Sequence, residues 1–393
     1  MDKIFGLKKN VFWLGLVSLF NDFSAEMVQS VMPVFLTTVL GAPVFFVGLL
    51  EGFADALASF LKIFSGWFSD KIKRRKLPAF LGYVLSISVR PFLAVVGNYW
   101  QVFGLRIVDR VGKGFRDAPR DALISESVSS SELGKSFGYH RMMDTIGATV
   151  GPLVAFLILP LVFYEYRLLF LIAFLIGILS LLSFFSVKDV KKTTESSKKL
   201  KLDFSLFRRN KKFSLFILAV FIFGLGALPI PLLLLRAPDI GLNIANVPLF
   251  YFIFSLSFVF VSLPLGWLSD KIGQRKVISF GFAAALIAYL GLILSQSFLT
   301  LALMFVILGF YSAATDGVSR ALAANLIESE FLATGQGLLN AAVGLSALVA
   351  GVVGGSLWNF ISAEAAFVYA AAMSFIGLVL FIILTKPSTN KVL

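Results

Sequence analysis

Two acidic residues inside an apolar stretch are the side chains in this sequence best suited to chemistry. Asp22 and Glu26 are four residues apart in the first long apolar run, so on a helix they share one face. Two carboxylates this close in a low-dielectric environment cannot both ionise without a large energetic cost. The pair is therefore a candidate proton carrier. A permanent ion pair with Arg106 or Arg141 is the structural alternative.

Further charges recur in later apolar runs, where a buried ionisable side chain costs several kcal/mol and normally has a function. Arg106 and Asp109 lie on one helical stripe, and Arg141 and Asp144 are three residues apart. We expect a single network of six residues: Asp22, Glu26, Arg106, Asp109, Arg141 and Asp144. In the second half of the chain, Asp316 is the main predicted buried acid and a candidate substrate contact. Its neighbour Arg320 is able to neutralise it.

The composition restricts the class of protein that can position these charges. The chain has 393 residues, of which 58% are hydrophobic and only 15% charged, which is too apolar for a soluble protein. The net charge of +13 lies in short loops rather than in a nucleic-acid-binding face. With no Cys and one His, the sequence offers no thiolate or His-cluster metal site, and we expect neither a metal nor a cofactor.

Apolar segments of about 20 residues can cross the hydrocarbon layer as helices. We predict an all-α, multi-pass membrane protein with twelve spans in two pseudo-symmetric bundles of six. The predicted domains are residues 1–187 and 213–393, joined by a polar linker at 188–212. The predicted spans are 12–40, 45–69, 77–97, 99–125, 135–160, 167–187, 213–235, 246–269, 277–295, 298–326, 332–361 and 364–385.

The distribution of Lys and Arg predicts the orientation of these spans. The turn after span two, the turn after span eight and the linker hold most of the cations, whereas the alternate loops hold few. Lys and Arg are enriched in cytoplasmic loops, so we expect the linker and both termini to be cytoplasmic, in the cytoplasmic (inner) membrane.

The two basic turns are also copies of one another. Gly66 and Asp70 in the first correspond to Gly266 and Asp270 in the second, in the frame Gly-Trp-x-Ser-Asp-Lys-Ile. We predict that these turns form a gate that closes one side of the protein in one state and opens in another. The predicted gate residues are Gly66, Asp70, Lys71, Arg74, Arg120, Asp121, Gly266, Asp270, Lys271, Arg275 and Arg320.

With these motifs the chain resembles the major facilitator superfamily over essentially its whole length. Both Gly-x-x-x-Asp-Lys turns look like that family's signature, and Arg106 is similar to an Arg that its antiporters use in proton coupling. Gly147, Gly151 and Pro152 resemble a helix-packing signature of the proton-driven antiporters. The resemblance implies alternating access around a central site, and a monomer as the usual form.

We therefore expect a secondary transporter in contact with membrane lipid that moves a small molecule, with protons as the coupling ion. The leading prediction is efflux of amphipathic, drug-like compounds. The alternative is a proton-coupled symporter or exporter of a polar or anionic metabolite that uses Arg106 or Arg141 as a ligand. A lipid scramblase or a membrane enzyme is a remote alternative, because no catalytic constellation is present in the sequence.

Overall fold

The computed structural model describes residues 3–72, 75–129, 132–189, 210–328 and 331–385, with side chains except at 62–72 and at Ala333. The first residues pair as a small hairpin of β1 (Lys3–Ile4) and β2 (Leu7–Lys8), and long helices follow. The first half contains α1 (Lys9–Val34), the π-helical turn η1 (Phe35–Val39), α2 (Val44–Ile72), α3 (Lys76–Leu93), α4 (Tyr99–Glu126), α5 (Leu133–Ile158) and α6 (Tyr166–Phe185). The second contains α8 (Lys211–Gly224), α9 (Ile230–Leu234), α10 (Arg236–Asp239), the 3₁₀ turn η3 (Ile244–Asn246), α11 (Val247–Ile272), α12 (Gln274–Leu294), α13 (Phe298–Leu326), α14 (Leu332–Phe360) and α15 (Ala363–Leu384).

These helices form an all-α, multi-pass membrane protein, as predicted. Within the described ranges, nine helices are long and apolar enough to cross a membrane by themselves. The charged helices α3 and α4 and the interrupted segment α8–α10 complete the twelve predicted crossings. Helix α4 is too polar to count among the nine because it carries many Arg, Lys and Asp side chains, several of which belong to the site described below.

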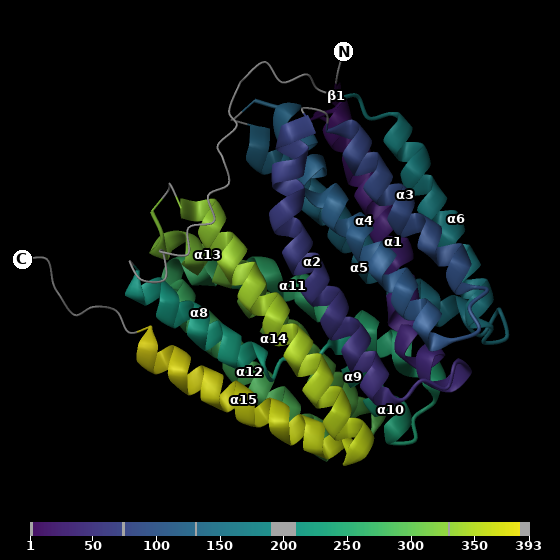
Figure 1. The fold of residues 1–393 in the computed structure, drawn as a ribbon, viewed down its shortest axis with the longest axis vertical. Coiled ribbons are helices and arrows are strands. Elements are labelled where there is room, and N and C mark those ends of the chain that lie inside the picture. The colour runs from purple at the N-terminus through teal and green to yellow at the C-terminus, as the bar shows by residue number, and fades with distance from the viewer. Residues whose placement is uncertain (1–2, 73–74, 130–131, 190–209, 329–330, 386–393) are drawn as a thin grey trace, which may run out of the picture.

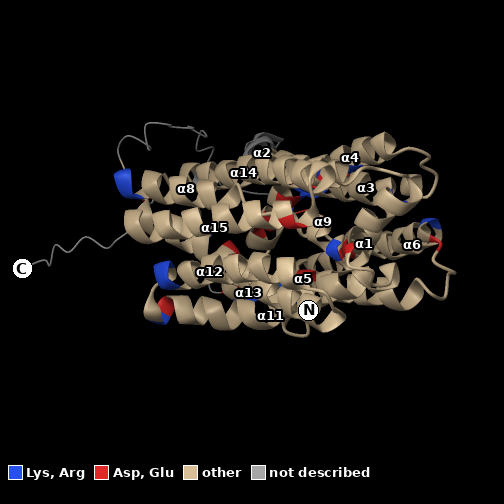
Figure 2. Cartoon of the chain, turned by 90° about the horizontal axis from the view of Figure 1, so that it is seen from below, with Lys and Arg blue, Asp and Glu red and all other residues tan. Residues whose placement is uncertain are grey.

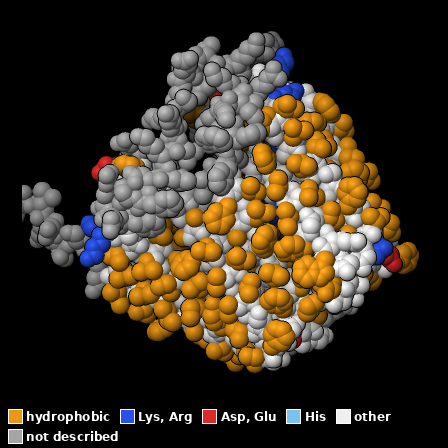
Figure 3. Space-filling model, in the orientation of Figure 1, with side chains coloured by type: hydrophobic (Ala, Val, Ile, Leu, Met, Phe, Trp, Pro, Cys, Tyr) orange, Lys and Arg blue, Asp and Glu red, His pale blue; other side chains and the backbone are white. Residues whose placement is uncertain are grey.

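The outer surface of the molecule is largely apolar. In Figure 3 hydrophobic side chains cover most of the face that is not drawn in grey, with charged ones at its edges. On α6 and α12 large apolar side chains recur along the exposed stripe, among them Leu175, Leu182, Ile287 and Leu294. A continuous apolar surface of this extent is the surface that a bilayer covers.

The helices pack into two bundles that lie side by side (Figure 1). In the first bundle α1 packs against α5 and α6, and α4 packs against α2 and α3. In the second, α12 packs against α13 and α15, and α15 packs against α8. We call the side of the membrane that carries the N-terminal hairpin the terminal side, and the opposite side the distal side. The predicted linker 188–212 lies largely outside the described residues.

One predicted span is interrupted, so the expectation of a continuous helix over 213–235 is wrong. Helix α8 ends at Gly224, and the chain resumes helical structure only at α9, after Pro229. Proline lacks an amide hydrogen, and tyrosine hydroxyls satisfy the freed backbone groups instead. Tyr289 accepts a bond from the Leu228 amide at 3.2 Å, and Tyr369 donates to the Leu225 carbonyl oxygen at 2.8 Å.

The bundles meet most closely along a glycine seam between α2 and α14. Gly48 faces Gly351 with no room for a side chain on either, and Gly52 lies against the Ala347 carbonyl oxygen. The contact continues to Ser59, opposite Gly344. At 1.5 Å per residue it follows α2 for about 20 Å from the distal end. Small residues permit this approach because nothing separates the two backbones.

Candidate functional site

The first part of the site is a charged cluster on α2 and α4, made of Glu51, Asp55, Arg106, Asp109 and Arg110. Nη2 of Arg106 donates to both carboxylate oxygens of Glu51 at 2.9 Å, and both side chains are buried. Arg106 also pairs with Asp109 at 3.4 Å, and Arg110 lies 3.7 Å from Asp55. Glu51 accepts a further bond, at 2.9 Å, from Nε2 of Gln29 on α1. Buried charge of this kind is tolerated because each ion has a partner.

The second part is a pair of acids, Asp22 on α1 and Asp144 on α5. Their carboxyl groups lie close enough to interact directly. Asp144 also accepts from Ser18 Oγ at 2.8 Å and from Arg141 at 3.1 Å, and Arg116 lies 3.9 Å from Asp22. Helices α1 and α5 hold these acids in place because they pack closely along their length.

The single network of six residues is therefore not what the structure contains. Arg106 and Asp109 belong to the charged cluster, where the partner of Arg106 is Glu51 rather than Asp22 or Glu26. Arg141 joins Asp22 and Asp144 instead. A carboxylate oxygen of Glu26 accepts a hydrogen bond from the Tyr251 hydroxyl on α11, at 2.6 Å.

A cavity of about 200 Å³, which we call the charged cavity, joins these groups. The second half covers it through Pro229, Ile230 and Pro231 at the break in span seven, and through Tyr251. Every ionisable Asp, Glu, Arg or Lys around it comes from α1, α2 or α4: Asp22, Glu26, Glu51, Asp55, Arg106, Asp109, Arg110, Lys113 and Arg116. In Figure 2 acidic segments are visible in the interior around α9.

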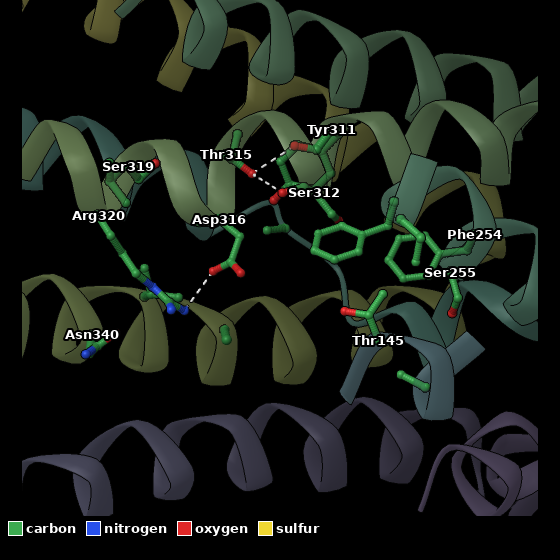
Figure 4. Close-up of a pocket in the computed structure, with 18 of the residues that line it drawn as sticks. Thr145, Phe254, Ser255, Tyr311, Ser312, Thr315, Asp316, Ser319, Arg320 and Asn340 are labelled. Carbon is green, nitrogen blue, oxygen red and sulfur yellow. Dashed lines mark hydrogen bonds and ion pairs between the residues drawn. The ribbon is translucent and has the colours of Figure 1, made fainter. Parts of the chain in front are cut away.

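A larger cavity of about 470 Å³ lies between the two halves, and we call it the aromatic cavity (Figure 4). Its aromatic wall comes from the second half and consists of Phe223, Tyr251, Phe254, Phe258, Phe282 and Tyr311. The first half contributes Glu26, Arg141, Asp144 and the polar side chain of Thr145. An apolar wall facing a few charged groups is typical of sites for organic molecules.

Asp316 lies in this cavity but is not the buried acid that the sequence predicts. Its side chain is 41% exposed, and it pairs with Arg320 at 2.8 Å on the same helix, as Figure 4 shows. Because the spacing is i,i+4 on α13, the pair forms within one helix face and needs no partner from elsewhere. Both side chains are accessible because the cavity is open around them.

The aromatic cavity opens toward the terminal side and is closed on the distal side. Arg141 and Arg320, on the terminal-side parts of α5 and α13, are 62% and 52% exposed. Farther toward the distal side, Glu26 and Tyr251 are hydrogen bonded, and beyond them the glycine seam is closed. The protein is therefore in a conformation open to the terminal side.

Among the predicted gate residues whose side chains the structure describes, none has a recorded contact that bridges the two halves in this conformation. For Gly66, Asp70, Lys71 and Arg74 the surroundings lie outside the described part. Asp121 pairs with Arg120 at 2.9 Å rather than with a turn of the other half. Arg275 bonds within its own half, to Thr385 Oγ1 at 2.8 Å and to the Ile382 carbonyl oxygen.

The remaining residues of the second turn also stay within their own half. Lys271 lies over the Trp267 ring, with 4.4 Å between Nζ and the ring centroid. Asp270 is exposed, and a Cβ on Gly266 would meet open space. An open terminal side is the state in which gate contacts would be absent, so the gate stays a prediction.

The glycines of the predicted packing signature lie against α1. A Cβ on Gly151 would come 2.5 Å from the Phe23 carbonyl oxygen, and Gly147 similarly faces Leu19. Pro152 follows on the same helix and is buried. The close approach of α5 to α1 is what brings Asp144 beside Asp22.

Sequence reasoning did not include Glu51, Arg110, Arg116 or Tyr251 among the site residues. For Glu51 and Asp55 a signal was present, since they repeat the i,i+4 spacing of Asp22 and Glu26. Tyr251 gave none, because a tyrosine in an apolar span is ordinarily a packing or interface residue.

Comparison with known proteins adds an independent result. A family model described as Major Facilitator Superfamily matches residues 14–253 and 215–393. An MFS-type transporter of Methanocaldococcus jannaschii is 33% identical over 384 residues, which is 96% of this chain and 95% of the relative. The multidrug resistance protein MdtH of Cronobacter sakazakii is 28% identical over 129 residues, 33% of this chain and 31% of the relative. The solved structure of the nucleoside transporter NupG matches with a TM-score of 0.82 at 14% identity, covering 96% of this chain and 100% of that one.

Proposed function

The chain belongs to the Major Facilitator Superfamily, and we propose that it is a proton-coupled exporter of amphipathic, drug-like compounds. It alternates between a state open to the terminal side and a state open to the distal side. We propose that the terminal side is cytoplasmic, because the basic loops lie there, and that the protein works as a monomer in the cytoplasmic membrane.

The observation that carries this proposal is the composition of the aromatic cavity. Six aromatic side chains form one wall, and Glu26 and Asp144 lie on the other. Aromatic faces bind apolar rings, and they attract organic cations over their π-systems. An amphipathic cation therefore finds an apolar wall and an acidic partner in the same cavity. A relative over one third of the chain that is named as a multidrug resistance protein is consistent with such cargo.

The proton site that we propose is the Asp22–Asp144 pair, together with Glu26. Two carboxyl groups this close are costly to ionise together, so the pair is able to hold one proton, and losing it changes the charge facing the cavity. Export then exchanges a cytoplasmic compound for protons entering from outside. In this cycle an arriving cation is bound when the acids have released their proton.

The test is transport by the purified protein in liposomes that contain a pH-sensitive dye. Ethidium and tetraphenylphosphonium serve as cationic probes, and benzenesulfonate, which stays ionised and does not carry protons through the bilayer by itself, serves as an anionic one. We expect the cations, and not benzenesulfonate, to drive proton movement, and Asp22→Asn and Glu26→Gln to abolish the coupling. Glu328→Gln is the control, because Glu328 is an exposed acid outside both cavities. Intact coupling in both cavity variants would refute the proton-carrier role.

The alternative cargo is a polar or anionic metabolite. Arg141 and Arg320 support it, since both guanidinium groups are exposed in the aromatic cavity. Each is already paired with an aspartate, at 3.1 and 2.8 Å, so an anion would have to compete with a carboxylate. Arg106 is a weaker candidate ligand, because Glu51 occupies its guanidinium group. Proton flux driven by benzenesulfonate alone would favour this second function.

A further inference from the structure

Glu26 and Tyr251 are the two described residues that line both cavities. The charged cavity and the aromatic cavity share no other lining residue in the part of the chain that the structure describes. The Tyr251 hydroxyl donates to Oε2 of Glu26 at 2.6 Å, and the Tyr251 ring packs on Phe254, with 6.0 Å between ring centroids. The hydrogen bond between Tyr251 and Glu26 therefore lies where the aromatic cavity meets the charged cavity.

This hydrogen bond joins the two halves of the protein. Glu26 is on α1 and Tyr251 is on α11, and the bond lies between the open aromatic cavity and the closed distal seam. When the distal side opens, contacts between the halves on that side must separate. The donor to Glu26 is therefore present in one conformation and absent in the other.

Most of the other charged groups that line the two cavities do not change in this way. Ten of them belong to the first half: Asp22 on α1, Glu51 and Asp55 on α2, Arg106, Asp109, Arg110, Lys113 and Arg116 on α4, and Arg141 and Asp144 on α5. These ten move with Glu26 when the first half reorients as a body. Asp316 and Arg320 on α13 line the aromatic cavity from the second half and pair with each other at 2.8 Å. Tyr251 is the second-half side chain that donates a hydrogen bond to Glu26.

We propose that Tyr251 is the positioning residue that makes the charge state of Glu26 depend on conformation. A hydrogen bond donated to a carboxylate stabilises its ionised form. In the state open to the terminal side, the Tyr251 hydroxyl stabilises ionised Glu26, so the carboxyl O–H bond breaks and the proton passes to water in the aromatic cavity. Tyr251 keeps its own proton throughout.

In the state open to the distal side, Glu26 loses this donor and takes up a proton from water on that side. One full cycle therefore moves a proton from the distal side to the terminal side, which is the direction that drives export. The direction of proton movement in this inference rests on the proposed export function. The link between Tyr251 and Glu26 does not depend on any particular cargo.

A spectroscopic titration tests the link without a substrate. The infrared carbonyl band of protonated carboxyl groups is followed against pH in the wild type, and the component lost in Glu26→Gln is assigned to Glu26. In Tyr251→Phe, which keeps the ring but not the hydroxyl, we expect the midpoint of that component to rise by about one pH unit, a tenfold change. Tyr99→Phe removes a hydroxyl outside both cavities and should leave the midpoint unchanged.

Two results would overturn the proposal. One is an unchanged midpoint of the Glu26 component in Tyr251→Phe, and the other is the absence of any component that Glu26→Gln removes. The liposome assay separates this proposal from the proposed function. If the wild type moves no probe and no protons, the export function fails, whereas the titration still decides whether Tyr251 sets the charge state of Glu26.

Discussion

The glycine seam between α2 and α14 allows the equilibrium between conformations to be shifted by one methyl group. In Gly52→Ala the new Cβ would lie 2.8 Å from the Ala347 carbonyl oxygen, where ordinary contact begins at 3.4 Å. The backbones must therefore separate by about 0.6 Å, and overpacking of this kind costs about 1–3 kcal/mol. The cost applies only when the seam is closed, because α2 and α14 belong to different halves.

The expected result is a shift of about 5- to 150-fold toward the conformation open on the distal side. Because the chain has no native Cys, introduced pairs can be spin-labelled without background. Leu161 and Leu299 are 76% and 77% exposed near the distal ends of α5 and α13, and a pair placed there reports distal opening. Lys135 and Lys276, both exposed, report the terminal side.

The matched control is Gly104→Ala on α4, where a Cβ would meet open space. Both substitutions raise helix propensity by a similar amount, so a difference between them comes from the seam. We expect the distal distance to lengthen and the terminal distance to shorten in Gly52→Ala alone. Identical distance distributions in the two variants, with both proteins monodisperse and helical, would refute the reasoning.

Three further predictions follow from individual contacts. Tyr289→Phe removes one of the two acceptors of the buried Leu228 amide in the break of span seven, the other being the Gly226 carbonyl oxygen, so thermal unfolding should show a loss of about 0.5–1.5 kcal/mol, and an unchanged melting temperature would contradict this. Arg106→Gln leaves Glu51 without its main cation and should abolish transport in liposomes, whereas full transport would show that their pairing is dispensable. Outside the spans, the hydrogen bond from Lys3 lowers the pKa of Glu132. The stabilisation is therefore present at neutral pH and disappears as acid protonates Glu132, so limited proteolysis of the N-terminal hairpin should accelerate at low pH, and Glu132→Gln should make it independent of pH.

The positions of the helices could be predicted well because apolar length and basic loops are local properties of the sequence. The exception, the break after Gly224, had a local signal in Pro229 and Pro231, but a hydrophobicity pattern continues across such a break. Part of what stabilises the break is long-range, since the Tyr369 hydroxyl on α15 donates to the Leu225 carbonyl oxygen. Sequence alone does not tell which distant side chain will supply that partner.

The pairing of charges was harder to predict than their presence. Spacing correctly identified the stripe on α4, but Arg106 turned out to face Glu51 on α2 rather than the acids on α1. The rotation of each helix about its axis decides such pairings, and it depends on packing with several neighbours at once. The pairing of Tyr251 with Glu26 depends in addition on how the two halves meet, and that arrangement changes with conformation.

The division of side chains between the halves has a consequence for how such a protein diversifies. The charged cavity draws its Asp, Glu, Arg and Lys side chains from the first half, whereas the aromatic wall belongs to the second. Substitutions in that wall alter which molecules fit while leaving the ion pairs of α2 and α4 intact. Substrate selectivity is therefore able to change through single substitutions in the second half while the charged cluster stays the same. Descendants with unrelated substrates are expected to differ most in α11 and α13, and least where α1, α2 and α4 meet.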